Sequence, residues 1–277
     1  MIYKLKFMSI KNNFLFLRMK TGNFNIFAEK KIEMAAWTVS REVRNKVGNF
    51  DSDWIFTLRD LDLPPCFAEC AVKALNKMVR EGELKKFSKG KFYKPKKSVF
   101  GELEPSREEI LKDLLVKDGK RIGYMTGYVV FNKYALTTQV ANVIQIATNK
   151  RKVKIQRGIY CVIFVQQVNE ITEETIPLLQ LLDVIRMIKE IPDANVNRSC
   201  ERLLYLLKDL PDSERDRLIG LAMNYNPGTR ALTGAMIEKL WGMEQAKPLY
   251  DSLNPVTSYS LGIDETVLPT IKKWRIL

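Results

Sequence analysis

The sequence of 277 residues contains no histidine. This absence excludes Ser-His-Asp and Cys-His catalytic arrangements, acid–base catalysis by an imidazole, and zinc sites of mixed Cys/His type. The four cysteines (Cys66, Cys70, Cys161 and Cys200) contain no CxxC pair, and they are too few for the disulfide framework of a secreted protein. We therefore expect no bound metal ion and a reducing, cytoplasmic location.

Signatures of nucleotide binding and of membrane insertion are also missing. The sequence contains neither GxxxxGK[ST] nor a GxGxxG that follows a strand. No apolar run approaches the roughly 18 residues that a membrane span requires, and the FLFL cluster near the start is too short for a signal peptide. The carboxylates at residues 209–216 fit a loop and the acidic first turn of a helix. These absences predict a protein that is not an enzyme and has no cofactor and no membrane partner.

Positive charge is in excess, and it is concentrated in the first third of the chain. The net charge is +13 and the pI is about 9.5. Residues 1–97 hold 21 Lys/Arg against 10 Asp/Glu, whereas residues 98–277 hold 24 against 22. Neutralising nucleic-acid phosphates releases condensed counterions, so such a surface attracts DNA. A solvated basic face and an anionic-membrane contact are the alternatives that charge alone leaves open.

The most basic stretch has the pattern of a helix followed by a β-hairpin, which favours DNA over those alternatives. After Pro64, apolar residues recur at a spacing of three and four, and Gly82 marks the helix end. The sequence ELKKFSKGKFYKPKK then predicts two short strands around Ser88–Gly90. With further helices expected at residues 39–47 and 58–61, residues 34–97 are predicted to form a winged helix-turn-helix.

The candidate DNA contacts lie on the polar face of that helix and on the hairpin. Asn76 and Arg80 are expected to read bases, because amide and guanidinium groups pair bidentately with adenine and guanine. The lysines are expected to contact the DNA mainly through its phosphates, which position a protein without reading sequence. These lysines are Lys73 and Lys77 on the helix, and Lys85, Lys86, Lys89 and Lys91 on the hairpin.

The rest of the chain predicts an α+β fold in several parts. Residues 1–33 differ in composition from the residues after them, so we interpret them as an N-terminal extension, with Met34 or Met19 as the working start. Residues 98–225 are expected to form an α+β domain, and residues 226–277 a C-terminal helix with an irregular tail. Within these parts we expect helices at 107–116, 172–190, 196–208, 213–225 and 230–241, strands near 143–147, 153–156 and 161–165, and a turn into a strand at 136–140.

Three sequence blocks, in order, resemble AbiEi-type antitoxins, the regulators of bacterial type IV abortive-infection toxin–antitoxin pairs. The likeness covers about residues 36–225. The blocks are AVKALNKMVREGELKKFSKGKFYKPKKSVFGELEP, GYMTGYVVFNKYALTTQV and TNKRKVKIQRG, and the central pattern consists of Gly127, Asn132, Leu136, Thr138, Gln139 and Val140.

The resemblance implies a specific function for each domain. The N-terminal winged domain would repress its own operon at upstream operator DNA, with the contacts on the candidate residues of the helix and hairpin. The C-terminal antitoxin domain would counteract a nucleotidyltransferase-like toxin, without a stable contact between the two proteins being required. Thr137, Thr138 and Gln139 receive no role from the resemblance, and a turn with side-chain-to-backbone hydrogen bonds explains them equally well.

Two other classes of function remain open on the sequence alone. One is a plain winged-helix transcription factor whose second domain senses a ligand or dimerises. The other is a nucleic-acid enzyme that uses carboxylates of the second domain to hold a metal ion. A neighbouring toxin gene would distinguish the antitoxin from the first, and magnesium-dependent turnover would identify the second.

Overall fold

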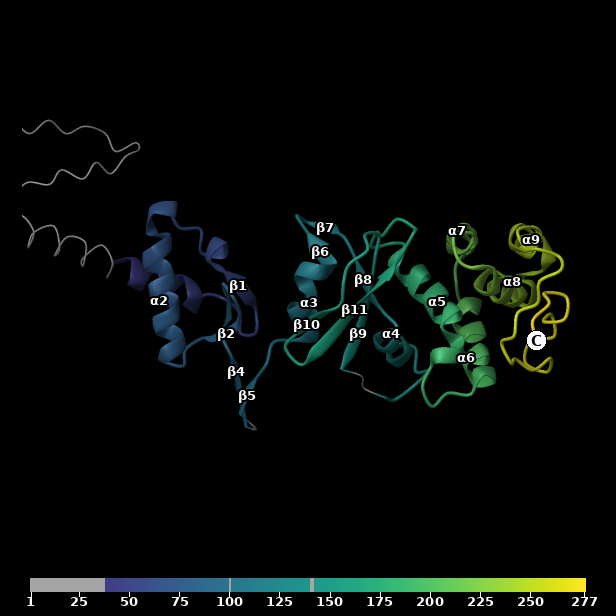
Figure 1. Ribbon diagram of the computed structural model, residues 1–277, viewed down its shortest axis with the longest axis horizontal. Coiled ribbons are helices and arrows are strands. Elements are labelled where there is room, and N and C mark those ends of the chain that lie inside the picture. The colour runs from purple at the N-terminus through teal and green to yellow at the C-terminus, as the bar shows by residue number, and fades with distance from the viewer. Residues whose placement is uncertain (1–37, 100, 140–141) are drawn as a thin grey trace, which may run out of the picture. The chain divides into compact units, whose positions relative to one another are not determined.

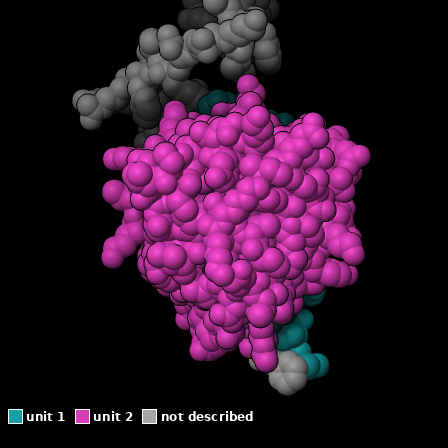
Figure 2. Space-filling view, turned by 90° about the vertical axis from the view of Figure 1, so that its right-hand side faces the viewer, with its two compact units in different colours: residues 1–105 teal, residues 106–277 magenta. Residues whose placement is uncertain are grey.

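The computed structural model describes residues 38–99, 101–139 and 142–277. The chain forms two compact units, residues 1–105 and residues 106–277, which Figure 2 colours teal and magenta. The expectations for residues 1–33 and for a start at Met34 lie outside the described residues. The fold is α+β, as predicted.

In its described residues, the first unit combines two α-helices with small antiparallel sheets (Figure 1). A helix includes residues 38–48. The elements after it are β1 (Ile55–Thr57), η1 (Leu58–Leu61), η2 (Pro65–Phe67), α2 (Ala68–Arg80), β2 (Lys85–Ser88), β3 (Lys91–Tyr93), β4 (Lys96–Ser98) and β5 (Gly101–Leu103).

The predicted helix and its buried face are confirmed in α2. Ala71, Leu75 and Met78 are buried against the valines of the preceding helix and against Phe56. The helix ends at Arg80, and Gly82 takes a φ of 76° that favours glycine. The first turn differs from the prediction, because the segment opened by the two prolines is a 3-10 turn, as is the short helix η1.

The hairpin predicted around Ser88–Gly90 is confirmed as β2 and β3. These strands pair antiparallel, and β1 adds to the other edge of β3 in the order β1-β3-β2. The structure divides the chain after Pro105 and not after Lys97 as predicted, because residues on both sides of Lys97 form the hairpin β4–β5 within the first unit. Lys85 Nζ contacts Glu102 Oε2 at 2.7 Å, which ties β2 to β5.

The first part of the second unit contains a four-stranded mixed sheet of strand order β10-β11-β9-β8 (Figure 1). The central strands β11 and β9 are parallel, and the outer pairs are antiparallel. Ser106 caps the first helix of this unit by accepting a hydrogen bond from Glu109 N. The elements are α3 (Arg107–Leu115), β6 (Val116–Lys117), β7 (Lys120–Arg121), β8 (Tyr124–Thr126), α4 (Tyr128–Lys133), β9 (Val143–Thr148), β10 (Ile155–Arg157) and β11 (Tyr160–Gln166).

The strand expected to follow the turn at residues 136–140 is not present in its described part. Residues 136–139 form a loop after α4, because Leu136 N bonds back to Phe131 O and closes the helix end. The other predicted strands are present as β9, β10 and β11, with each end within two residues of its predicted position.

The remainder of the second unit is helical and shares one core with the sheet. The helices are α5 (Ile176–Arg186), η3 (Ile188–Glu190), α6 (Val196–Lys208), α7 (Asp212–Ala222), α8 (Pro227–Trp241) and α9 (Met243–Asp251). The core runs without interruption from Tyr124 and Phe131 to Trp274 and Ile276. The C-terminal helix and tail expected at residues 226–277 therefore belong to the second unit, and α9 is a helix that the sequence did not predict. None of the described helices is both long and apolar enough to cross a membrane.

Candidate nucleic-acid interface

The polar face of α2 presents the four candidate contacts predicted on it. Lys73, Asn76, Lys77 and Arg80 are all exposed, while the opposite face is buried. Their spacing of three and four residues places them on one side of the helix. The structure therefore brings these four side chains together on a single accessible surface.

The candidate lysines of the hairpin differ in exposure. Lys85, Lys86 and Lys89 are exposed, and Lys91 is half-buried. Phe92 packs in the core of the unit next to Phe56, with ring centroids 6.2 Å apart. The hairpin is thus fixed by its apolar side chains and directs most of its lysines to solvent.

Ion pairs divide the candidate cations into two groups. Lys73 contacts Glu69 at 3.2 Å, Lys77 contacts Glu81 at 3.8 Å, and Lys85 contacts Glu102 at 2.7 Å. The hydrogen bond and charge of Glu102 raise the pKa of Lys85, so that lysine stays protonated. Arg80, Lys86 and Lys89 form no ion pair within the described part of the chain, so their charge is available to an anionic ligand. Exposed pairs contribute only about 0–1 kcal/mol, so a phosphate can displace them.

Arg44 is a residue of this surface that the sequence did not predict. Its guanidinium forms ion pairs with Glu81 and, at 3.4 Å, with Glu83. These are the two carboxylates within the basic stretch 73–97. Arg44 therefore holds both acids at the end of α2 and offsets their negative charge, which leaves the exposed face of α2 more positive.

Thr137, Thr138 and Gln139 lie in the loop after α4, in the other unit. Gln139 N donates to Thr137 Oγ1 at 3.2 Å, and Asn132 Nδ2 donates to Gln139 O at 2.7 Å. The Gln139 side chain also bonds to Asp193. These are the contacts of a turn anchored to its neighbours, in agreement with the structural interpretation of these three residues.

Comparison with known proteins places this chain in a family. Residues 54–213 match the family DUF6088, which is described as a family of unknown function. The chain belongs to DUF6088. The match begins just before β1, includes α2, both hairpins and the sheet, and ends at the start of α7. It therefore covers every candidate contact, whereas Arg44 lies outside it.

A solved structure similar to this DUF6088 protein is that of the RV2827C protein from Mycobacterium tuberculosis. The two chains are 14% identical, and the similarity covers 80% of this chain and 83% of the other, with a TM-score of 0.50. This likeness shows a shared fold alone. Comparison with curated proteins gives no match.

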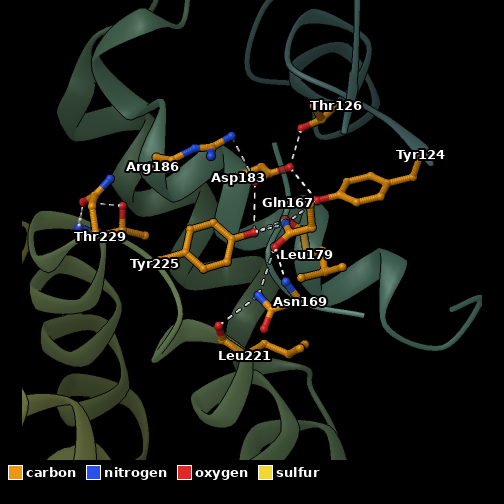
Figure 3. Close-up of polar contacts among 11 residues, drawn as sticks. Tyr124, Thr126, Gln167, Asn169, Leu179, Asp183, Arg186, Leu221, Tyr225 and Thr229 are labelled. Carbon is orange, nitrogen blue, oxygen red and sulfur yellow. Dashed lines mark hydrogen bonds and ion pairs between the residues drawn. The ribbon is translucent and has the colours of Figure 1, made fainter. Parts of the chain in front are cut away.

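The second unit of the DUF6088 protein contains a buried polar network centred on Asp183 of α5 (Figure 3). Asp183 is 0% exposed. Its Oδ2 accepts hydrogen bonds from the hydroxyls of Tyr124 and Thr126, each at 2.8 Å. Its Oδ1 accepts from the Tyr225 hydroxyl at 2.9 Å and lies 3.2 Å from the Arg186 guanidinium.

A glutamine completes the network by holding both tyrosine hydroxyls. Gln167 Nε2 donates to Tyr124 Oη at 2.9 Å and to Tyr225 Oη at 3.0 Å, and Gln167 Oε1 accepts from Asn169 N. Burial, together with the nearby Asp183, raises the pKa of both tyrosines, so each remains a protonated donor. The network joins β8, the segment after β11, α5 and the segment between α7 and α8.

Groups with displaced pKa values often mark active sites, but the geometry here indicates a structural role. Both oxygens of Asp183 already have two partners each, so no acceptor position is left for a substrate or a metal ion. The described residues also contain no group of three or more His, Cys, Asp or Glu side chains that could hold a metal ion. We therefore assign the network to the architecture of the fold.

Proposed function

We propose that this DUF6088 protein is a DNA-binding autoregulator that acts as the antitoxin of a type IV toxin–antitoxin pair. In this proposal the first unit is a winged helix-turn-helix, with α2 as the recognition helix and β2–β3 as the wing. The observation that carries the proposal is the single exposed face of Lys73, Asn76, Lys77 and Arg80, followed directly by a hairpin of exposed lysines.

Each part of this surface has a distinct task. Asn76 and Arg80 of α2 read base edges in the major groove, because their side chains offer the bidentate geometry that adenine and guanine require. Lys86 and Lys89, whose charge is not offset by a carboxylate of the described residues, hold phosphates beside the wing. Lys73, Lys77, Lys85 and Lys91 add to the positive potential around these contacts.

The antitoxin part of the proposal is supported by the resemblance of the three sequence blocks to AbiEi-type antitoxins. The second unit counteracts a nucleotidyltransferase-like toxin encoded beside this gene, whether or not the two proteins bind stably. In cells whose growth that toxin inhibits, coexpression of this protein with the toxin is expected to restore growth. The Arg80→Ala variant should still restore it, because repression and neutralisation reside in different units.

The first test is fluorescence anisotropy with the DNA upstream of this gene and with a scrambled fragment, across a salt series. We expect a preference of about tenfold or more for the upstream fragment, with affinity that falls steeply as salt rises. Equal, weak binding to both fragments would contradict autoregulation and leave only a generic basic surface.

Replacing Asn76 or Arg80 with alanine is expected to weaken binding to the upstream DNA by about 1–3 kcal/mol, because a bidentate base contact is lost. Binding to scrambled DNA should change much less. Anisotropy on both fragments measures the difference. Equal losses on both would show that these two side chains do not read bases.

Replacing Lys86 and Lys89 with alanine is expected to weaken binding to every DNA sequence alike. Each lost phosphate contact should reduce the slope of log K against log salt by about one. The Lys208→Ala variant, which removes an exposed lysine of α6 in the other unit, is the control. A slope unchanged in the wing variant would place the hairpin outside the interface.

A further inference from the structure

The second unit contains a concentration of positive charge that its near-neutral average conceals. The 51 residues from Gly119 to Asn169 include eight Lys/Arg and no Asp/Glu. Four of these cations, Lys150, Arg151, Lys152 and Lys154, fall within five residues, between the end of β9 and the start of β10. All four side chains are exposed.

Three of these residues line a hollow of about 270 Å³, together with the end of β11. The hollow is formed by Lys150, Arg151, Lys152, Phe164, Val165 and Gln166. We call it the loop hollow. It lies where the parallel strands β9 and β11 reach their carboxyl ends.

The backbone of the loop is fixed by hydrogen bonds from the polar side chains of Thr148 and Asn149. Thr148 Oγ1 donates to Lys150 O at 2.7 Å. Asn149 Nδ2 donates to Gln167 O at 2.9 Å and to Asn169 O at 2.7 Å, which ties the loop to the segment after β11. The cations of the loop hollow are therefore attached to a backbone that hydrogen bonds hold in one conformation.

The side chains of the hollow are positioned by neutral groups. Arg151 Nε donates to Gln166 Oε1 at 2.9 Å, and Lys152 Nζ lies over the Phe164 ring, 5.2 Å from its centroid. Within the described residues none of the four loop cations forms an ion pair. By contrast, Arg157, just beyond them, is paired with Asp113 at 2.9 Å. Cations that are ordered without being neutralised have already lost part of the entropy that binding an anion would cost.

Two exposed apolar side chains are close in sequence to the residues of the loop hollow. Val153 is 82% exposed and follows Lys152 directly, and Val168 is 71% exposed, two residues after Gln166. A duplex hides the faces of its bases and gains nothing from such contacts. A single strand offers both its phosphates and its apolar base faces to one surface.

We propose that the loop hollow binds single-stranded nucleic acid, with Lys150, Arg151 and Lys152 on the phosphates. Val153 and Val168, which are close in sequence to residues that line the hollow, contact the bases. This site is separate from the duplex-binding surface of the first unit, and it stands whether or not that proposed function holds.

The test measures binding of the full chain to fluorescein-labelled 12-mers of U-only RNA and T-only DNA. The Arg151→Gln/Lys152→Gln variant is expected to lose about tenfold in affinity and to lower the salt slope by about 1.4, or 0.7 for each of two phosphates. Lys208→Gln/Lys247→Gln is the matched control, since it removes the same charge from exposed positions of α6 and α9, and it should change affinity less than twofold.

Other arms of the experiment identify the ligand. If the RNA or the DNA strand binds more tightly than a glutamate 12-mer does, the proposal is supported, and the tighter of the two strands identifies the kind of nucleic acid that is bound. Equal losses in the two variants, or tighter binding of a glutamate 12-mer than of either oligonucleotide, would overturn it. Hydrogen exchange on the unmodified chain is independent of any variant, and we expect the 12-mer to protect residues 149–154 and 164–168. Absence of that protection would also overturn the proposal.

Discussion

Replacing Asp183 with alanine is expected to lower the free energy of unfolding by about 3–5 kcal/mol, as measured by urea denaturation. The substitution removes the acceptor for three hydroxyl donors and leaves the Arg186 guanidinium without its carboxylate. These donors come from β8 and from the segment between α7 and α8, so the loss also weakens the junction between sheet and helices. A decrease below about 1 kcal/mol would mean that water replaces the carboxylate without strain.

The Asp183→Asn variant separates shape from charge at the same position. Asparagine keeps the volume of the side chain and one acceptor oxygen. Its NH₂ group replaces the other oxygen, and this group is itself a donor that faces donors. We expect an intermediate loss of about 1–3 kcal/mol, because some buried donors lose their acceptor. A loss as large as that of the alanine variant would show that the second oxygen is as important as the first.

Comparing the natural chain with the Asp183→Asn variant across pH also tests the titration of Asp183. Burial raises the pKa of this carboxyl, while Arg186 and the hydroxyl donors act in the opposite direction. With a raised pKa the folded state keeps its proton to a higher pH than the unfolded state, whose carboxyl ionises near pH 4. The stability of the natural chain relative to Asp183→Asn should therefore fall as pH rises from about 4. A difference that rises with pH would show that the hydrogen bonds outweigh burial.

The first unit could be predicted well because its signals are local. The three-and-four spacing in α2 and the glycine at residue 82 define a helix face and a helix end without reference to the rest of the chain. The hairpin β4–β5 was missed because its place in the unit depends on a contact between Lys85 and Glu102, which are 17 residues apart. Sequence periodicity contains no information on such a contact.

The candidate interface shows the same limit. The spacing along α2 predicted which side chains share an exposed face, but it could not predict which of them meet a carboxylate. Arg44 lies 37 residues from Glu81, and this pairing depends on how two helices pack. The Asp183 network was missed for a similar reason, since its members come from four segments. A signal did exist, because Asp183 is the one charged residue in the mostly apolar run LLQLLDVI of α5.

The end of the chain was expected to be irregular, and it contains little regular structure after α9. Its apolar residues nevertheless belong to the core of the second unit. Trp274 is 0% exposed, its ring meets that of Tyr250 edge to face at 5.2 Å, and its Nε1 donates to Glu238 Oε2 at 2.6 Å. A single tryptophan in an irregular segment shows no periodicity, so the sequence could not predict that it is part of the core.

Replacing Trp274 with alanine is therefore expected to lower the free energy of unfolding by about 3–5 kcal/mol, the usual loss when a large buried aromatic side chain is removed. The substitution leaves a cavity beside α8 and removes one of the two hydrogen-bond donors to Glu238, while Lys273 remains. Urea denaturation of the full chain measures the effect. A loss below about 1 kcal/mol would show that the end of the chain only rests on the surface.

A pair of glycine substitutions tests the packing under Trp274 without removing the ring. Gly234 lies in α8, where an added Cβ would come within 2.1 Å of the Trp274 ring, whereas Gly220 in α7 has no atom within 4 Å of the same position. Alanine at residue 220 should raise stability by about 0.5–1 kcal/mol, because it favours the helix. Alanine at residue 234 should lower it by about 1–3 kcal/mol, because a rigid buried ring must move. If both variants gained stability equally, the close contact between Trp274 and α8 would be refuted.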